Sequence, residues 1–397
     1  MRTLLLGLGL MNINAENIIQ SKLHRIMIRN LLVFSFLLIS SVVSIKAQRV
    51  QVVDTDGLPI AAVCVTNEKG ALVGSTDNDG WLNDAKGVKH LFFSHVAFKA
   101  KDVNIDTIPS LCVVMEDENF QLAELEVKPK ELLYVQTYYR CVYVCDEGPI
   151  YFRAGVVDNT YEIAKKKISA KTRSVSKGMN GFYRFVLSTL VGHFIDEYAR
   201  IDTMTHYKKI LKNVDKGNLF ITEGPSGRRL VSDTISVLGY IDDDLQAGQR
   251  ITNFDRWAYR DHLEATEAAA KEAKTGKKQK QKQKEEKYRD ENNSNYEVYN
   301  IDENGQSRID DLVMRQILAS GHFKRTDQDY IILLETYTIG RDYIDKKEFK
   351  QTRKENEVEM DINELRRLEQ NHHIPPLAPN LKAAVDQLFE KELNDNQ

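Results

Sequence analysis

Residues 52–82 read VVDTDGLPIAAVCVTNEKGALVGSTDNDGWL, and this stretch decides the fold class of the first part of the chain. Asp-Gly occurs twice, at Asp56-Gly57 and Asp79-Gly80, each time between runs of β-branched and small apolar residues. Asp and Gly tolerate the positive-φ positions of tight turns, and an Asp side chain accepts hydrogen bonds from nearby backbone amides. The repeated pattern therefore predicts hairpin turns.

A pair of calcium loops is the other interpretation of these carboxylates. An EF-hand loop needs a glycine at its sixth position and a glutamate at its twelfth. Counted from Asp54 or Asp77, the glycine falls at position four, and position twelve is Val65 or Val88. We therefore expect the carboxylates to shape turns and to bind no metal.

Short apolar runs continue on both sides of this stretch and predict further strands. They are Val50–Val53, Ala61–Val65, Leu91–Phe93, Val103–Ile105 and Leu111–Met115. Many short strands separated by glycine-bearing turns are typical of a β-sandwich. We expect an all-β sandwich over residues 48–128.

Residues 49–127 also carry a set of motifs at consistent places. The set consists of Asp54, Gly57 and Pro59, then Gly74, Thr76, Asp77 and Gly80, and finally Leu122, Glu124, Leu125 and Val127. With these motifs the segment resembles the carboxypeptidase-regulatory-like domain, a transthyretin-like (prealbumin-like) β-sandwich found at the N-terminus of TonB-dependent outer-membrane transporters and other exported bacterial proteins. Ser94 matches only in part, because Ala97-Phe98 replace the family's Gly-Tyr. The resemblance implies a fold and an exported setting, and it implies no peptidase activity.

Residues 1–47 have the features of a leader with a secretory signal peptide. Arg29 precedes an apolar run that continues to Val43, and a small residue follows at Ala47. Met27 is a possible start, and a single membrane anchor is the alternative interpretation. We expect an exported protein that begins at Gln48, lies in the periplasm or at the outer membrane of a Gram-negative bacterium, and has no transmembrane segment once the signal is removed.

Residues 130–397 predict an α+β domain with an antiparallel sheet and terminal helices. Strands are expected at 132–145, 148–163, 218–224, 234–241, 295–305 and 329–339, and the best helix of the middle region at 181–201. Asp361 and Glu364 form a capping-box pattern at the start of a later helix. Asn380 is expected to cap the last helix. For residues 132–145, an amphipathic helix is the alternative.

A lysine-rich insert, residues 265–294, interrupts this second domain. Six lysines lie between residues 274 and 284, in a stretch without apolar residues, so we expect a solvated helix extension or loop. An anionic partner is the alternative. Nucleic acid is not expected, because the net charge is −3 and the insert has no interleaved aromatic residues.

No complete catalytic motif is found, and we expect no catalytic, cofactor-binding or metal-ligating residues and no cofactor. The sequence around Ser226 fails the spacing of a nucleophile elbow, and His372-His373 are expected to sit at a helix C-terminus, where imidazolium complements the dipole. The four cysteines are expected to be core thiols, with their disulfide state open: Cys64, Cys112, Cys141 and Cys145.

The sequence favours a non-enzymatic cell-envelope protein that uses its sandwich as a binding or spacing module. The partner is expected to be an envelope protein or a glycan, and the oligomeric state stays open. The alternative is an envelope hydrolase or a lipid or glycan carrier, with Asp242–Asp244, His193 and Asp196 as the first residues to test. A pocket of ~300–1,000 Å³ would favour the carrier, and converging acids with raised pKa values would favour the hydrolase. A solvated turn is the expected role of Asp242–Asp244.

Overall fold

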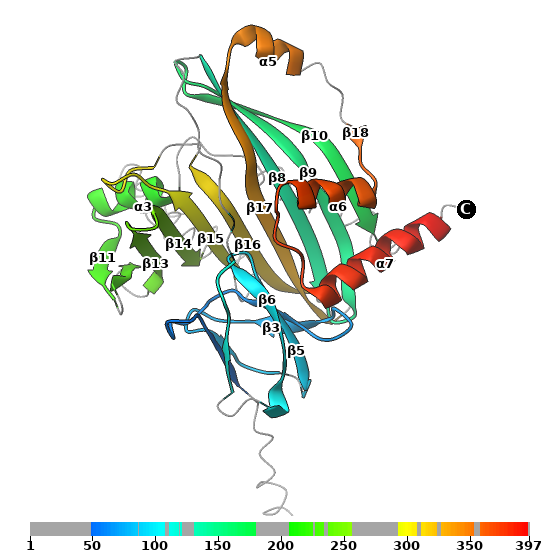
Figure 1. Cartoon of the computed structure of the whole chain (residues 1–397). Coiled ribbons are helices and arrows are strands. Elements are labelled where there is room, and N and C mark those ends of the chain that lie inside the picture. The colour runs from blue at the N-terminus through cyan, green and yellow to red at the C-terminus, as the bar shows by residue number, and fades with distance from the viewer. Residues whose placement is uncertain are drawn as a thin grey trace, which may run out of the picture. The chain divides into compact units, whose positions relative to one another are not determined.

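The computed structural model describes residues 49–85, 87–107, 111–118, 120, 131–179, 206–224, 227–233, 237–255, 293–307, 311–323, 327–352 and 358–395. The chain divides into Met1–Ala47, which lies outside these ranges, and the compact unit Gln48–Gln397. The described part of that unit is mostly β, with three sheets and a few short helices (Figure 1). The expected boundary between residues 128 and 130 falls in a stretch outside the described ranges.

Two small sheets form the first part of the fold. One has the order β4-β1-β7 and the other the order β3-β2-β5-β6. The strands are β1 (Val50–Val53), β2 (Cys64–Thr66), β3 (Leu72–Ser75), β4 (Trp81–Leu82), β5 (His90–His95), β6 (Phe98–Asn104) and β7 (Cys112–Val114), with the short 3₁₀ helix η1 (Ile105–Thr107) after β6. The prediction of short strands with glycine-bearing turns is confirmed here.

A single apolar core joins these two sheets. Val52 of β1 and Leu82 of β4 share one buried cluster with Phe93 of β5. The three side chains are at most 2% exposed. We call these seven strands the two-sheet unit.

The third sheet is much larger and has 11 strands in the order β11-β12-β13-β14-β15-β16-β17-β8-β9-β10-β18. Its strands are β8 (Leu132–Cys145), β9 (Gly148–Glu162), β10 (Lys167–Met179), β11 (Phe220–Glu223), β12 (Arg229–Ser232), β13 (Val237–Asp244), β14 (Gln249–Asp255), β15 (Asn293–Asn300), β16 (Leu312–Phe323), β17 (Gln328–Ile344) and β18 (Val358–Glu359). All neighbours pair antiparallel except β10 and β18. The predicted antiparallel sheet is confirmed.

Alternation along β8 explains why this segment is a strand and not the alternative helix. Tyr139, Cys141 and Tyr143 belong to one buried cluster, whereas Tyr138 and Val142 belong to another. Successive side chains of a strand point to opposite faces, so β8 contributes to a core on each side of the sheet. We call the Tyr138 side the inner face, because the two-sheet unit packs on it.

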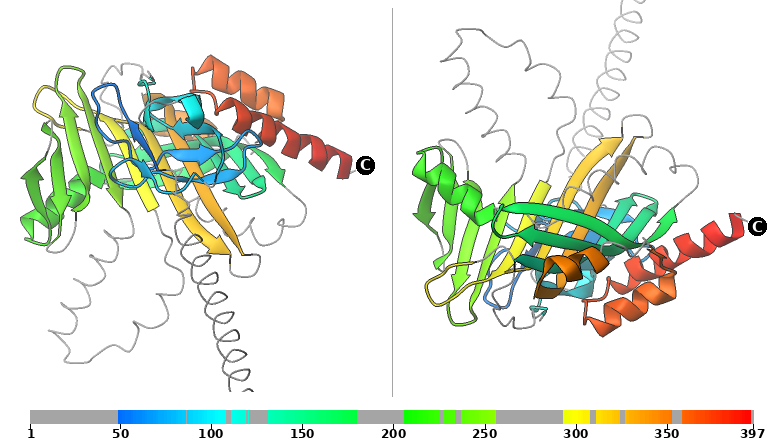
Figure 2. Two further views of the ribbon diagram at one scale, coloured as in Figure 1. Left: turned by 90° about the horizontal axis from the view of Figure 1, so that it is seen from below. Right: turned by 90° about the horizontal axis from the view of Figure 1, so that it is seen from above.

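Helices cover the two ends of the large sheet. α3 (His206–Asp215) packs over β12–β14, whereas α6 (Ile362–Asn371) and α7 (Pro379–Asp395) lie at the other end, near β8–β10 (Figure 2). A short helix, α5 (Lys346–Thr352), follows β17. Within the described ranges, no helix combines the length and the apolar composition that crossing a bilayer requires.

The start of α6 is confirmed as predicted, and the start of α7 is corrected. The Asp361 side chain accepts hydrogen bonds from the backbone N–H groups of Asn363 and Glu364, and the Glu364 carboxylate accepts one from the backbone N–H of Asp361. α7 begins at Pro379, so Asn380 lies inside the first turn and is not the cap. Proline is favoured at the first helical position because its missing N–H has no partner there anyway.

Several predictions concern residues that the structure leaves undescribed. The helix expected at 181–201, with His193 and Asp196, lies outside the described ranges. So do Ser226 and the lysine-rich insert, apart from its last two residues, with which β15 begins.

Candidate functional site

The turns that opened the sequence analysis are held by their own aspartates. Asp54 Oδ1 accepts hydrogen bonds from the backbone N–H groups of Asp56, at 3.0 Å, and Leu58, at 2.7 Å. Asp77 Oδ1 accepts from those of Asp79, at 3.1 Å, and Trp81, at 2.9 Å. The prediction that these carboxylates shape turns is confirmed.

The same turn geometry occurs at two more places in the chain. Asn67 Oδ1 accepts from the N–H groups two and four residues later, and so does Asp302 Oδ1. A glycine with positive φ stands three residues after the first position in all four turns. These are Gly57, Gly70, Gly80 and Gly305. An Asp or Asn followed three residues later by Gly is thus the local signal of these hairpins.

Asp54 has a second role that reaches beyond its own turn. Its Oδ2 lies 3.6 Å from Nη2 of Arg228, while Nε of Arg228 donates to Asp242 at 3.2 Å. The guanidinium carbon also lies 4.5 Å from the ring centroid of Tyr240. Arg228 therefore links the two-sheet unit to β13 of the large sheet.

The prediction of a solvated turn at Asp242–Asp244 is wrong for its first two residues. All three end strand β13, and Asp242 and Asp243 are only partly exposed. Asp243 accepts hydrogen bonds from Arg229, at 2.6 Å, and from Arg250, at 2.5 and 2.8 Å. Asp244 alone turns the chain, because its carboxylate accepts from two following amides. The acids are held by separate arginines and do not face one another as a catalytic pair.

Backbone groups of the two-sheet unit are bound directly by a side chain of the large sheet. The amide of Gln316, on β16, is fully buried. It accepts a hydrogen bond from the N–H of Val96, at 2.8 Å, and donates one to the carbonyl of Ala62, at 2.9 Å. Beside it, the ring of His95 packs edge-on against Tyr296 of β15, with the centroids 4.6 Å apart. These contacts fix one end of the two-sheet unit on the inner face.

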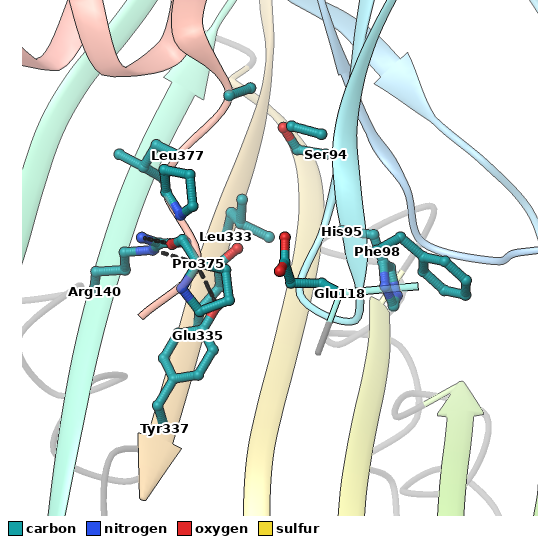
Figure 3. Close-up of a pocket in the computed structure, with 13 residues that line it drawn as sticks. Ser94, His95, Phe98, Glu118, Arg140, Leu333, Glu335, Tyr337, Pro375 and Leu377 are labelled. Carbon is teal, nitrogen blue, oxygen red and sulfur yellow. Dashed lines mark hydrogen bonds and ion pairs between the residues drawn. The ribbon is translucent and has the colours of Figure 1, made fainter. Parts of the chain in front are cut away.

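A buried charged cluster lies on the inner face, centred on Arg140 of β8 (Figure 3). Arg140 forms an ion pair with Glu335 of β17 through Nε, and donates from Nη1 to the carbonyl of Pro375 at 2.7 Å. Burial alone would lower the pKa of Arg140, but the opposing charge of Glu335 and the neighbouring Tyr337, Tyr138 and Glu369 raise it above its usual value. The guanidinium therefore stays charged inside the protein.

The cluster extends from the sheet into the C-terminal helices. Tyr138 donates a hydrogen bond to Glu369 of α6 at 2.6 Å, and Arg366 donates to the same carboxylate at 2.9 Å. Arg366 also donates to Asp386 of α7 at 3.0 Å. Burial raises the pKa of Tyr138 well above its usual value, and Glu369 adds to this effect. The cluster is a set of paired charges that holds α6 and α7 on the sheet.

A small cavity of about 30 Å³ lies where the two-sheet unit, the large sheet and residues 375–378 meet. Its lining includes Ser94, His95 and Glu118 from the first part of the chain and Arg140 and Glu335 from the sheet (Figure 3). About one or two water molecules fit in such a volume, which is a tenth of the smallest ordinary ligand pocket. This cavity is therefore no substrate pocket.

His95 is a titratable group that burial in this interface perturbs strongly. Burial lowers its pKa to about 3, so the imidazole is neutral at physiological pH. Its Nδ1 accepts from the N–H of Ala97 at 3.3 Å, and its Nε2 has no hydrogen-bond partner in the structure as described. A proton on this ring would place an unpaired charge in the interface.

A larger hollow of about 320 Å³ lies at the turn tips of the two-sheet unit. It is formed by residues 67–69 on one side and residues 88–90 on the other. Lys69 and Lys89 are exposed there, and His90 lies between the carboxylates of Glu68, at 2.9 Å, and Asp102, at 3.4 Å. The hollow opens to solvent, and most of its lining surface is apolar carbon, although every lining residue except Val88 has a polar or charged side chain.

The turn on one side of this hollow is anchored to α7. The side-chain amide of Asn380 donates to the Thr66 hydroxyl at 2.8 Å and to the Asn67 carbonyl at 2.7 Å. Gly70, which closes this turn, lies so close to α7 that a Cβ there would stand 3.0 Å from that of Ala384. The rim of the hollow is thus held by the C-terminal helix.

The cysteines and the histidine pair are not arranged for chemistry. All four cysteines are free, and only Cys112 is partly exposed. Burial raises the pKa of Cys64 to about 12, which keeps it a thiol. His372 caps the C-terminus of α6 as expected, but burial, with a smaller effect of His373, lowers its pKa, so the predicted imidazolium is not favoured there. No group of three potential metal ligands occurs in the ranges that the structure describes.

No protein-family model matches this chain, and no curated protein matches it in sequence.

Sequence reasoning did not single out the residues of the charged cluster or those that hold the two-sheet unit. Arg140 and Glu335 stand in apolar strand sequences, LLYVQTYYRCVYVC and QDYIILLETYTIGRDYI, in which a charge on the buried face needs a partner. That local signal identifies the two residues as paired. It cannot identify Glu369 or Gln316, which belong to elements far away in the sequence.

Proposed function

We propose that the protein is a non-enzymatic, exported cell-envelope protein in which a transthyretin-like β-sandwich, residues 48–128, serves as a binding module. The motifs shared with carboxypeptidase-regulatory-like domains support the sandwich and the setting, in the periplasm or at the outer membrane. The two small sheets with their common core agree with such a sandwich. The partner would be an envelope protein or a glycan.

The observation that carries this proposal is the contrast between the two spaces around the two-sheet unit. The space beneath the unit is filled, with a cavity of only about 30 Å³ among paired charges. The space between residues 67–69 and residues 88–90 is an open hollow of about 320 Å³. A unit whose inner side is filled, and whose hollow beside α7 stays open to solvent, is arranged to present that hollow to a partner.

The hollow itself favours a polar partner. Lys69 and Lys89 stand on opposite sides of it, and the His90 ring between them carries carboxylate neighbours that can accept hydrogen bonds. Glycan hydroxyls and acidic side chains both suit such surroundings, because hydroxyls need donors and acceptors at short range and carboxylates need donors. A hydrolase is less well supported, since the carboxylates of Asp242 and Asp243 each form an ion pair with an arginine.

Site-specific photocrosslinking in the cell envelope tests this proposal. A photoreactive residue at position 69 or 89 should give a crosslinked product that the same residue at the exposed position Lys212, on α3, does not give. With the photoreactive residue at position 89, Lys69→Glu should reduce the yield without changing the melting temperature. Equal crosslinking from position 212, or no product from positions 69 and 89, would contradict the proposal.

A further inference from the structure

The open hollow of the two-sheet unit is lined by both hydrogen-bond donors and acceptors. Its volume of about 320 Å³ lies at the lower end of the range of ordinary ligand pockets, ~300–1,000 Å³. Lys69 and Lys89 carry donors, and the carboxylate of Glu68 is an acceptor. Asn67 uses its Oδ1 for two amides of its own turn, and its Nδ2 group has no hydrogen-bond partner in the part of the chain that the structure describes. A ligand in the hollow can therefore both donate and accept.

The charges around the hollow favour an uncharged ligand over an acidic one. Lys89 forms an ion pair with Asp106 at 2.7 Å. The ring of His90 lies between the carboxylates of Glu68 and Asp102, with its nitrogens 2.9 and 3.4 Å from them. Three carboxylates, each more than half exposed, thus surround two lysines. An acidic ligand would bring like charges together, and this repulsion is absent for a neutral ligand.

The carbon surface of the hollow has the character that a sugar ring needs. Val88 and the aliphatic stems of the two lysines are the carbon-rich parts of its lining. The partly exposed ring of Phe92 lies beside that of His90, with the centroids 5.0 Å apart. A sugar ring carries C–H groups on its faces and hydroxyl groups around its edge, and each hydroxyl both donates and accepts. Carbon surface surrounded by donors and acceptors is complementary to such a ring.

Both sides of the hollow are held in place before a ligand binds. The turn of residues 67–70 is closed by the Asn67 side chain, and Asn380 of α7 donates to the carbonyl of the same residue. On the other side, His90 is the first residue of β5 and pairs with Asn104 of β6. A site whose backbone is already ordered loses little conformational entropy on binding.

We propose that this hollow binds an uncharged saccharide chain. One face of a sugar ring lies on the carbon surface of Val88 and the lysine stems, and its hydroxyls bind Glu68, Asn67 and the lysine ammonium groups. This inference rests on the proposed function and chooses the glycan over the envelope protein as the partner. Because the hollow opens to solvent and is small, binding is weak, with a Kd of about 1 mM.

Nuclear magnetic resonance of the full chain, labelled with ¹³C in its histidine rings, tests this inference. His90→Gln identifies the His90 signal among those of the nine histidines. The neutral probes are maltopentaose, cellopentaose and chitopentaose, and at least one of them should shift the His90 signal with a Kd of about 1 mM. Pentagalacturonate and pentaglutamate should bind at least about tenfold more weakly, because they meet the three carboxylates. Added salt should not weaken binding of the neutral probe, which forms no ion pair.

A matched pair of variants locates the binding site. Lys69→Ala removes a donor and a carbon stem and should weaken binding of the neutral probe about fivefold. Lys212→Ala makes the same change at an exposed position of α3 and should leave binding unchanged. Equal melting temperatures show that both variants are folded.

Three results would overturn the inference. They are no shift of the His90 signal with any neutral probe at about 10 mM, equal weakening by Lys212→Ala and Lys69→Ala, and tighter binding of pentaglutamate than of every neutral probe. If positions 69 and 89 crosslink to an envelope protein while no neutral probe binds, this inference fails and the proposed function stands. If neither crosslinking nor probe binding is found, both fail.

Discussion

At the scale of single residues, the aspartates that begin the two DxDG turns stabilise those turns locally. Asp77 satisfies two backbone amides of its own turn, and Asp54 does the same while also facing Arg228. Both roles use the carboxylate as a hydrogen-bond acceptor. The calcium interpretation required ligands that the spacing did not supply.

Replacing Asp77 by alanine tests the turn role against the metal role. Asp77→Ala removes the acceptor for two amides and should lower the free energy of unfolding by about 1–2 kcal/mol. The effect should be the same with calcium and with a chelator in urea denaturation. A calcium-dependent stabilisation that disappears in the variant would favour the metal role instead.

His95 predicts a specific loss of stability in acid. Its pKa of about 3 in the folded protein lies below the value of 6.5 in the unfolded chain. Below about pH 6 the unfolded chain binds a proton that the folded chain does not, so stability falls by up to about 1.4 kcal/mol per pH unit between about pH 6 and pH 3. Above about pH 7 both states are neutral and the contribution vanishes.

Urea denaturation of the protein and of His95→Gln between pH 4 and 8 measures this contribution. The difference in unfolding free energy between the two proteins should be constant above about pH 7 and should change toward acid, where the variant gains relative stability. Parallel pH profiles for the two proteins would show that His95 titrates normally.

At the scale of elements, hydrophobic periodicity and helix-capping patterns predicted the strands and helices whose formation depends on local sequence. Alternation predicted β8, the apolar run at 329–339 predicted β17, and the Asp361–Glu364 pattern predicted α6. The start of α7 was misplaced because Asn380 is a good capping residue whose amide is used by the two-sheet unit instead. Local preference was overridden there by a partner more than 300 residues away.

Two turn glycines provide a matched test of the hairpin geometry. Gly57 and Gly80 have φ angles of 80° and 74°, but a Cβ at Gly57 meets no atom within 4 Å, whereas one at Gly80 would stand 2.5 Å from the carbonyl oxygen of Val52. Gly57→Ala should cost about 1–2 kcal/mol from backbone strain. Gly80→Ala should cost about 1–3 kcal/mol more, because the backbone must shift. Equal costs in thermal or urea unfolding would contradict this geometry.

At the scale of the whole molecule, the contacts that hold the two-sheet unit on the rest of the protein join residues far apart in the chain. Gln316 binds Val96 across 220 residues, and Asn380 binds Thr66 across 314. Such pairs leave no periodic trace in a sequence, so the sequence predicted the elements but not the interface. Arg228 is the clearest case, because nothing near it in the chain indicates Asp54 as its neighbour.

The free energy of unfolding should fall more when one partner of the Arg140–Glu335 ion pair is replaced than when both partners are replaced. Arg140→Met leaves Glu335, which is 5% exposed, as a buried charge without its guanidinium, and should cost about 3–5 kcal/mol. Adding Glu335→Gln should recover part of that cost, because the remaining group is neutral. A double-mutant cycle in urea measures the coupling. A cost below about 1 kcal/mol for the single variant would mean that the pair is not buried in solution.

The central claim is that the two-sheet unit is fixed to the large sheet and is not an independently unfolding module. Calorimetric unfolding of the chain tests this most directly. The filled interface and its paired charges predict one cooperative transition, in which the calorimetric and van't Hoff enthalpies agree. Two separate transitions, with the smaller one unaffected by a Gln316 variant or by an Asn380 variant, would contradict the claim.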